Sequence, residues 1–154
     1  MKPVHGAGTQ ASSDEMSVGY LVARARTALL TSLDTELEPF GLTGAQFAVL
    51  KNVAEGTAAT AADLCRTMHY DTGSMTRMLD RLEEKSVLRR ERCTEDRRVV
   101  FLRMTTTGQE LLPQLRSAAV RVLSRHLAGF SPEEVDNLKQ YLERMIENGL
   151  PVNS

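Results

Sequence analysis

Small hydroxyl residues and arginines lie close together after Asp71, and this combination could form hydrogen bonds to nucleic acid. Hydroxyl groups and a glycine at the start of a helix allow the backbone to approach base edges, and an arginine can reach a guanine or a phosphate. An ordinary solvated helix face would have similar residues, so this segment alone leaves both interpretations open. The candidate contact residues are Thr72, Gly73, Ser74, Thr76, Arg77 and Arg81.

The elements that would position these residues are two short helices. Thr60 with Asp63 predicts the start of the first helix, and Asp71 predicts an N-cap for a second helix that begins near Thr72. In the second helix, apolar residues recur at spacings of three and four and should face a core. They are Met75, Met78, Leu79 and Leu82.

A predicted β-hairpin follows, with strands VLRRER and VVFLRMT joined by the turn CTEDRR. Arg97 and Arg98 would lie at its tip, where no core position needs them, and arginines on a protruding loop suit a narrow minor groove. Asp96 could hold Arg98 in a bidentate ion pair. In isolation this would be a plain turn. After two short helices, it indicates a winged helix-turn-helix.

Apolar residues with helical spacing extend over 17–40 and again after the hairpin, where Thr105 and Ser131 are candidate N-caps. Thr43 with Gln46 predicts a capping box, and 57–59 could add a third strand beside the wing. The fold class is mostly α with a small β-wing. We expect a flexible tail over 1–16, a single domain over 17–148 and a C-terminal tail over 149–154. Within the domain, residues 43–104 should form the winged helix-turn-helix, called the head below. Residues 17–40 and 105–148 should form the dimerisation helices.

The segment DTGSMTRMLDRLEEKSVLRRER and the wing signature within DRRVVFLRMT, followed by TTGQELL, resemble the MarR (multiple antibiotic resistance regulator) family over residues 20–146. The resemblance implies a winged-helix homodimer, usually a repressor, whose recognition helix enters the major groove of a pseudo-palindromic operator. It also implies that Arg98 enters the minor groove and that Asp96 supports it. Met104 and Ser86 are mild departures, where the family more often has leucine and glycine.

The resemblance further implies a small aromatic anion as effector, bound between the dimer helices and the head. Its candidate lining residues are Tyr20, Arg24, Thr27 and Phe47. Arg24 near an apolar wall could hold a carboxylate. Arg24 could equally be a surface charge, and the core is the favoured place for Phe47.

The charge balance disfavours a nonspecific nucleic-acid coat protein, because the formal net charge is only −1. Between residues 66 and 103, ten Lys or Arg stand against seven Asp or Glu, which predicts a basic head on an acidic body. An excess this small also fits a randomly mixed surface. Twofold DNA sites favour a dimer over helices that pack on their own head.

Enzymes are disfavoured because His5, His69 and His126 lie far apart and no phosphate loop or nucleophile pattern accompanies them. No metal or cofactor is expected. Cys65 and Cys93 lack metal-ligand spacing and are expected to be reduced structural thiols, with redox sensing at Cys93 as the alternative.

The sequence has no apolar run of about 20 residues and no hydrophobic signal core, which predicts a cytoplasmic protein without a membrane span. The predicted function is ligand-responsive transcriptional regulation. The alternatives are a winged-helix protein-interaction module and a constitutive DNA-binding protein.

Overall fold

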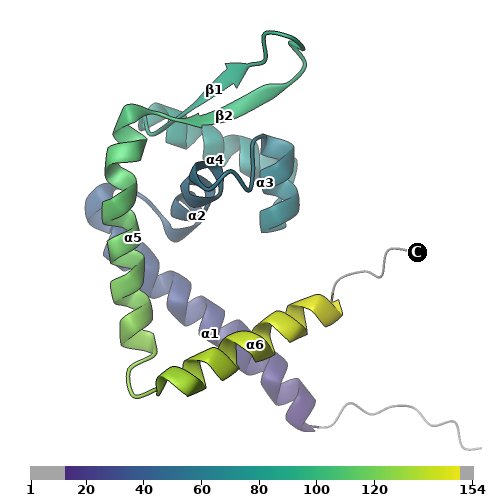
Figure 1. Cartoon of the computed structure of the whole chain (residues 1–154), viewed down its shortest axis with the longest axis vertical. Helices are drawn as coiled ribbons and strands as arrows, with labels where there is room; N and C mark the ends of the chain where they lie inside the picture. Colours follow the sequence, from purple (N-terminus) through teal and green to yellow (C-terminus); the bar gives the residue numbers. More distant parts are fainter. Residues whose placement is uncertain (1–12, 150–154) are drawn as a thin grey trace, which may run out of the picture.

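The computed structural model describes residues 13–149, with side chains from residue 17 onward (Figure 1). It is mostly helical with a two-stranded wing, as the sequence predicts. The elements in chain order are α1 (Ser13–Leu37), η1 (Glu38–Phe40), α2 (Gly44–Ala54), α3 (Ala61–Met68), α4 (Thr72–Glu84), β1 (Leu88–Arg92), β2 (Val100–Met104), α5 (Thr106–His126) and α6 (Pro132–Gly149).

The first helix differs from its predicted bounds at both ends. It begins at Ser13, so the prediction of a flexible tail is wrong for residues 13–16, while residues 1–12 and 150–154 of the two predicted tails lie outside the described residues. At its other end α1 stops at Leu37, and a single 3-10 turn containing Pro39 completes the predicted span. Gly41, with φ 65°, then turns the chain toward α2.

Side-chain caps define where the head helices begin. Thr43 with Gln46 forms the predicted capping box of α2, and Thr60 with Asp63 forms a second one at α3. Asp71 Oδ1 accepts a hydrogen bond from the Ser74 backbone N–H at 2.8 Å, which starts α4 at the predicted residue. These caps satisfy N–H groups that no helix carbonyl can reach.

The core of the head lies between α2, α3, α4 and the hairpin. The predicted apolar stripe of α4 supplies Met75, Leu79 and Leu82, which are fully buried, while Met78 is half-buried against them. Burial of this stripe fixes the rotation of α4 about its own axis, so its polar face must point outward.

The wing is an antiparallel pair in which Arg90 lies opposite Leu102. The described residues contain only this two-stranded sheet, so the prediction of a third strand at 57–59 is wrong. A trace of that pairing remains, because the Leu102 N–H donates to the Ala59 carbonyl at 2.8 Å. This single hydrogen bond ties the base of the wing to the loop before α3.

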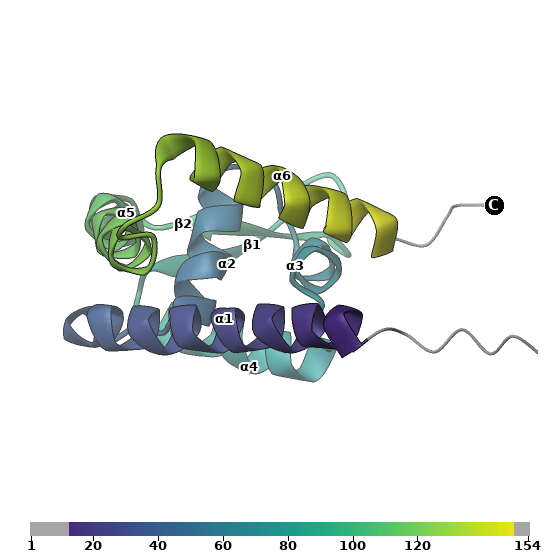
Figure 2. The same ribbon diagram turned by 90° about the horizontal axis from the view of Figure 1, so that it is seen from below.

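The helices outside the head form an open frame. α5 packs along α1. α6 follows α5 after a turn and lies at the end of the molecule opposite the wing (Figures 1 and 2). α6 contains no buried residue, so the alternative that all these helices pack on their own head is wrong for α6. The large apolar side chains exposed on the frame helices are Val18, Tyr20, Leu21, Val22, Val120, Leu123, Leu138, Tyr141, Leu142, Met145 and Ile146.

Candidate nucleic-acid interface

The outer face of α4 displays the residues that the sequence nominated for base contact. Thr72, Gly73, Thr76, Arg77 and Arg81 are exposed and Ser74 is half-buried. The Thr76 hydroxyl donates to the Thr72 carbonyl at 2.8 Å, and Arg77 Nη2 donates to Ser74 Oγ at 3.2 Å. Arg77 is therefore directed along the first turn of α4.

Asp71 gives the start of α4 a fixed negative charge. Hydrogen bonds from Ser74 hold the pKa of this carboxyl below its ordinary value of 3.8, because they stabilise the ionised form. The carboxylate also lies at the positive end of the helix dipole. It therefore remains ionised at neutral pH and holds the N-terminal turn of α4 in place.

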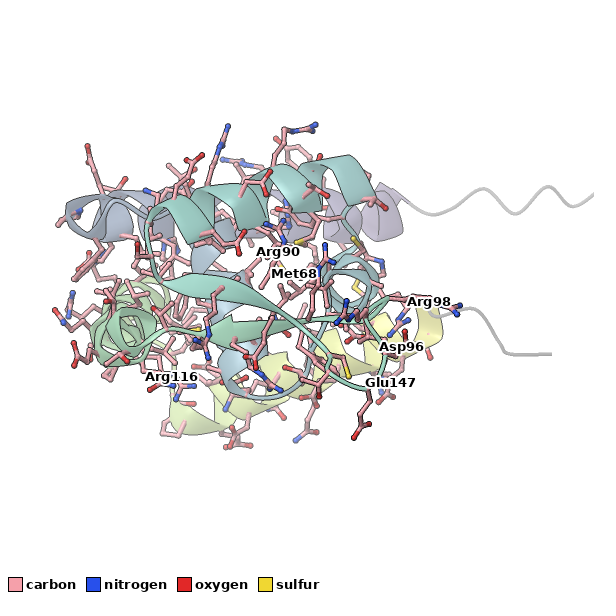
Figure 3. All side chains as sticks on the ribbon, turned by 90° about the horizontal axis from the view of Figure 1, so that it is seen from above. Met68, Arg90, Asp96, Arg98, Arg116 and Glu147 are labelled. Atoms are coloured by element: carbon pink, nitrogen blue, oxygen red, sulfur yellow. The ribbon has the colours of Figure 1, made fainter. Side chains whose placement is uncertain are left out.

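The wing tip presents arginine to solvent. The Arg98 side chain is 95% exposed and points away from the body of the protein, as Figure 3 shows. Asp96 Oδ1 accepts the Arg98 backbone N–H at 3.0 Å, whereas the Arg98 Nε atom lies 3.9 Å from the same oxygen. The predicted bidentate pair is therefore absent from this structure. Asp96 braces the backbone of the turn, and its contact with the exposed guanidinium of Arg98 is a long one. Arg97 beside it is exposed as well.

Arg90 is a residue of this interface that the sequence interpretation missed. Its Nη1 donates to Asp80 Oδ1 at 2.8 Å and also to Glu83 Oε2. Its backbone N–H donates to Glu83 Oε1 at 2.8 Å, and its Nη2 lies 3.5 Å from the Thr76 carbonyl. The available signal was a pair of acidic residues one turn apart on the second helix, followed by an arginine in the adjoining strand.

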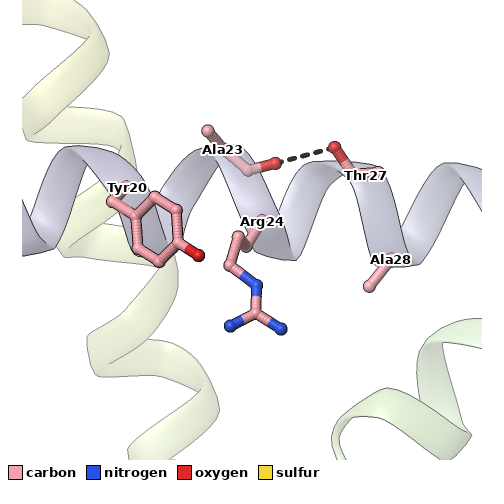
Figure 4. Close-up of a pocket in the computed structure, with 5 residues that line it drawn as sticks. All are labelled: Tyr20, Ala23, Arg24, Thr27 and Ala28. Atoms are coloured by element: carbon pink, nitrogen blue, oxygen red, sulfur yellow. Dashed lines mark hydrogen bonds between the residues drawn. The ribbon is translucent and has the colours of Figure 1, made fainter.

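A shallow groove on α1 brings together three of the four residues nominated for an effector (Figure 4). Tyr20, Arg24 and Thr27 line it, and the Arg24 guanidinium lies 5.6 Å from the centre of the Tyr20 ring. Phe47 lies elsewhere, 7% exposed in the core of the head. The core interpretation of Phe47 is therefore correct, and its nomination as a groove residue is wrong for this structure.

Other chemistry is limited in the part of the chain that the structure describes. Cys65 and Cys93 are free thiols, both half-buried. No group of three or more metal-ligating side chains lies together among residues 17–149, whose side chains the structure describes. In the same range, no helix combines the length and the apolar character that a membrane crossing needs.

Comparison with known proteins supports the same interpretation. The MarR family matches residues 42–100, which contain the head from α2 to the start of β2. A cysteine-to-serine mutant of MarR from E. coli, complexed with operator DNA, is similar with a TM-score of 0.77 and 26% identity, covering 86% of this chain and 95% of that chain. AbsC, a MarR family transcriptional regulator from Streptomyces coelicolor, has a TM-score of 0.77 and 26% identity, covering 90% of this chain and 95% of that chain.

These similarities extend over nearly the whole length of both relatives and include the frame helices as well as the head. The family consists of regulators and not of enzymes. The chain therefore belongs to the MarR family of DNA-binding transcriptional regulators.

Proposed function

We propose that α4 enters the major groove of a DNA operator while the tip of the wing enters the adjacent minor groove. The observation that carries this proposal is the exposure of Arg77 on α4 and of Arg98 on the wing, two elements that pack side by side (Figure 3). Arg77 can read a guanine edge, and Arg98 can follow the negative potential of a narrow minor groove. The E. coli relative complexed with operator DNA supports DNA binding by a chain of this fold.

The proposed reader is a homodimer held by α1, α5 and α6. Its support is the set of large apolar side chains that these helices leave exposed in a single chain, including Leu21, Leu138 and Ile146. A large amount of exposed apolar surface is typical of an interface. Two α4 helices related by a twofold axis would need half-sites about one helical turn, or roughly 10 base pairs, apart.

The proposed regulatory mode is repression relieved by a small aromatic anion. An operator that overlaps a promoter would exclude polymerase while the dimer is bound. The groove formed by Tyr20, Arg24 and Thr27 offers an aromatic surface beside a cation, which suits an aromatic carboxylate. A ligand would release DNA only if it binds better to a conformer whose recognition helices are wrongly spaced.

Selection of DNA duplexes from a random-sequence pool tests the DNA-reading function and identifies the operator sequence in the same experiment. The wild-type chain should enrich an imperfect palindrome with half-site centres about 10 base pairs apart. Footprinting should then show protection of about two turns on both strands. Failure to enrich any sequence would contradict this function and favour a protein-interaction module. Enrichment that no aromatic acid reverses would leave a constitutive DNA-binding protein.

A further inference from the structure

Arg90 joins the wing to the recognition helix at several points along that helix. Its partners Thr76, Asp80 and Glu83 are spaced four and three residues apart, so they form one stripe on the side of α4 that faces β1. This stripe spans about 10 Å of the helix. Contacts over such a length fix the angle between β1 and α4 as well as their separation, whereas a single contact would leave the strand free to pivot.

The second strand is anchored at the same level of the hairpin. Leu102 pairs with Arg90, is 2% exposed, and donates its N–H to the Ala59 carbonyl at 2.8 Å. The hairpin is thus held on both strands at this one level. Beyond it, the turn with Asp96 and Arg98 projects as an exposed arm.

The length of this arm makes the anchor important for contact with DNA. An arm of about five residues extends roughly 16 Å from the anchor. A tilt of about 10° at the anchor would displace the tip by nearly 3 Å, which is the length of a hydrogen bond. Small changes in the angle between β1 and α4 would therefore prevent the contact of α4 in the major groove and the contact of the wing tip in the minor groove from forming together.

Arg90 itself is poorly suited to hold a phosphate. Its side chain is only 28% exposed, and two carboxylates already take up its charge. Burial disfavours the charged guanidinium, but the hydrogen bond to Asp80 and the charge of Glu83 outweigh this and raise the pKa of Arg90. Its contribution to DNA binding would thus be indirect.

We propose that Arg90 is a positioning residue for DNA recognition: clamped by Asp80 and Glu83, it sets the wing relative to α4 so that both groove contacts form together. This inference rests on the proposed DNA-reading function. Under this proposal Glu83 strengthens DNA binding, whereas an ordinary acidic side chain near DNA weakens binding by repelling the phosphates.

Electrostatics and positioning predict opposite results for Glu83→Ala. Removal of a negative charge near the DNA-facing side should strengthen binding if long-range attraction is all that matters. Loss of the clamp should weaken binding, because the wing then samples several angles. Glu84→Ala is the matched control, since Glu84 is the exposed neighbour on α4 and its loss changes the net charge equally.

The probe is the duplex that the wild-type chain selects from a random-sequence pool, and the readout is the dissociation constant at one fixed salt concentration. Glu83→Ala should bind roughly 10-fold more weakly than the wild type, within the range of coupling between neighbouring residues. Glu84→Ala should bind as well as the wild type or better. Equal or tighter binding by Glu83→Ala would overturn the proposal.

A double-mutant cycle with Arg98→Ala separates positioning from general loss of stability. If the clamp aims the wing, Arg98→Ala should cost much less affinity in the Glu83→Ala background than in the wild type. A cost that is the same in both backgrounds would overturn the proposal, because the wing would then work without the clamp. If the wild-type chain selects no duplex, or if Arg98→Ala binds normally, the proposed DNA-reading function fails instead.

Arg90→Lys carries the same test if Glu83→Ala fails to fold. Lysine keeps the charge but lacks the planar fork that reaches two carboxylates at once. This variant should also lose roughly 10-fold in affinity and reduce the cost of Arg98→Ala. Normal binding by Arg90→Lys, or an unreduced cost of Arg98→Ala in its background, would overturn the proposal.

Discussion

Glu36 on α1 accepts a hydrogen bond from Nε of Arg121 on α5 at 2.8 Å. The other carboxylate oxygen of Glu36 accepts a hydrogen bond from Arg125 at 2.8 Å, and His126 lies 2.9 Å from Ser32 one turn away. These polar contacts link the two helices along the end of α5 that is farthest from the wing (Figure 1). They join the frame at positions distant in sequence, which the helical patterns alone could not reveal.

The first prediction concerns the pH dependence of this link. Hydrogen bonds from Arg125 and Arg121 lower the pKa of Glu36 below its ordinary value of 4.5. Stability from the ionised carboxyl is therefore complete above pH 4.5 and is lost as the pH falls through the lowered value in the folded protein. Glu36→Gln should melt at a lower temperature than wild type at pH 7 and approach it in acid.

Thermal melting between pH 3 and pH 7, roughly the range in which carboxyl groups titrate, checks this prediction. Glu110→Gln, an exposed position on α5, is the control and should leave the difference between neutral and acidic melting temperatures unchanged. If Glu36→Gln has the same melting temperature as the wild type at every pH, the link between Glu36 and the arginines contributes nothing to stability.

The second prediction concerns the close approach of α5 to Val87, in the turn between α4 and β1. A Cβ atom on Gly108 would lie 2.0 Å from the Val87 carbonyl oxygen, which is backbone and cannot move aside easily. Gly108→Ala should lower the free energy of unfolding by about 1–3 kcal/mol or more. The adjacent exposed change Thr107→Ala should stay within about 0.5 kcal/mol. Urea denaturation measures both, and equal stability of the two variants would refute the close packing.

Much of the head could be predicted from sequence because its signals are local. The caps at Thr60 and Asp71 and the apolar stripe of α4 act within a few residues of each other. The tip of the wing was identifiable because Arg97 and Arg98 lie in a polar turn sequence between two predicted strands. Each of these features depends on spacing along the chain.

The features that sequence analysis missed depend on how separate elements meet. The Arg90 clamp requires β1 to lie beside one stripe of α4, and no spacing rule specifies that arrangement. The bidentate pair between Asp96 and Arg98 was wrong because the carboxylate is used by the backbone of the turn. Phe47 was a false groove residue because its ring is buried in the core of the head and does not line the groove formed by Tyr20, Arg24 and Thr27.

The third prediction concerns the homodimer. Leu138→Arg would place a charge in the proposed apolar interface, where an unpaired charge is costly, and should yield monomers. Gln140→Arg, at an exposed polar position two residues further along α6, should leave the dimer intact. Light scattering at micromolar concentration and moderate salt measures the mass. A monomer mass for the wild-type chain would rule out the dimer.

The fourth prediction concerns the groove on α1. Benzoate, as a simple aromatic carboxylate, should bind the wild-type chain, and Arg24→Gln should weaken this binding by roughly tenfold, as expected for loss of a charged hydrogen bond. Arg26→Gln, the same change two residues away on the same helix, is the control. Titration calorimetry measures the affinity of the wild type and of the two variants for benzoate. Similar affinities for the two variants would exclude a specific role for Arg24.

The last prediction separates the roles of the two arginines that face the DNA. Arg98→Ala should weaken binding to all operator sequences alike, because the wing reads groove shape, and should reduce the slope of affinity against salt by about one unit. Arg77→Ala should instead relax the preference at one base position in each half-site, at a cost of about 1–3 kcal/mol.

The most direct test of DNA reading by α4 and the wing measures the dissociation constants of the wild type, Arg77→Ala and Arg98→Ala across single-base variants of the selected duplex and across a salt series. We expect a change of sequence preference for Arg77→Ala only, and a reduced salt slope with unchanged preference for Arg98→Ala. Equal losses on every sequence from both substitutions would contradict the division of roles between α4 and the wing.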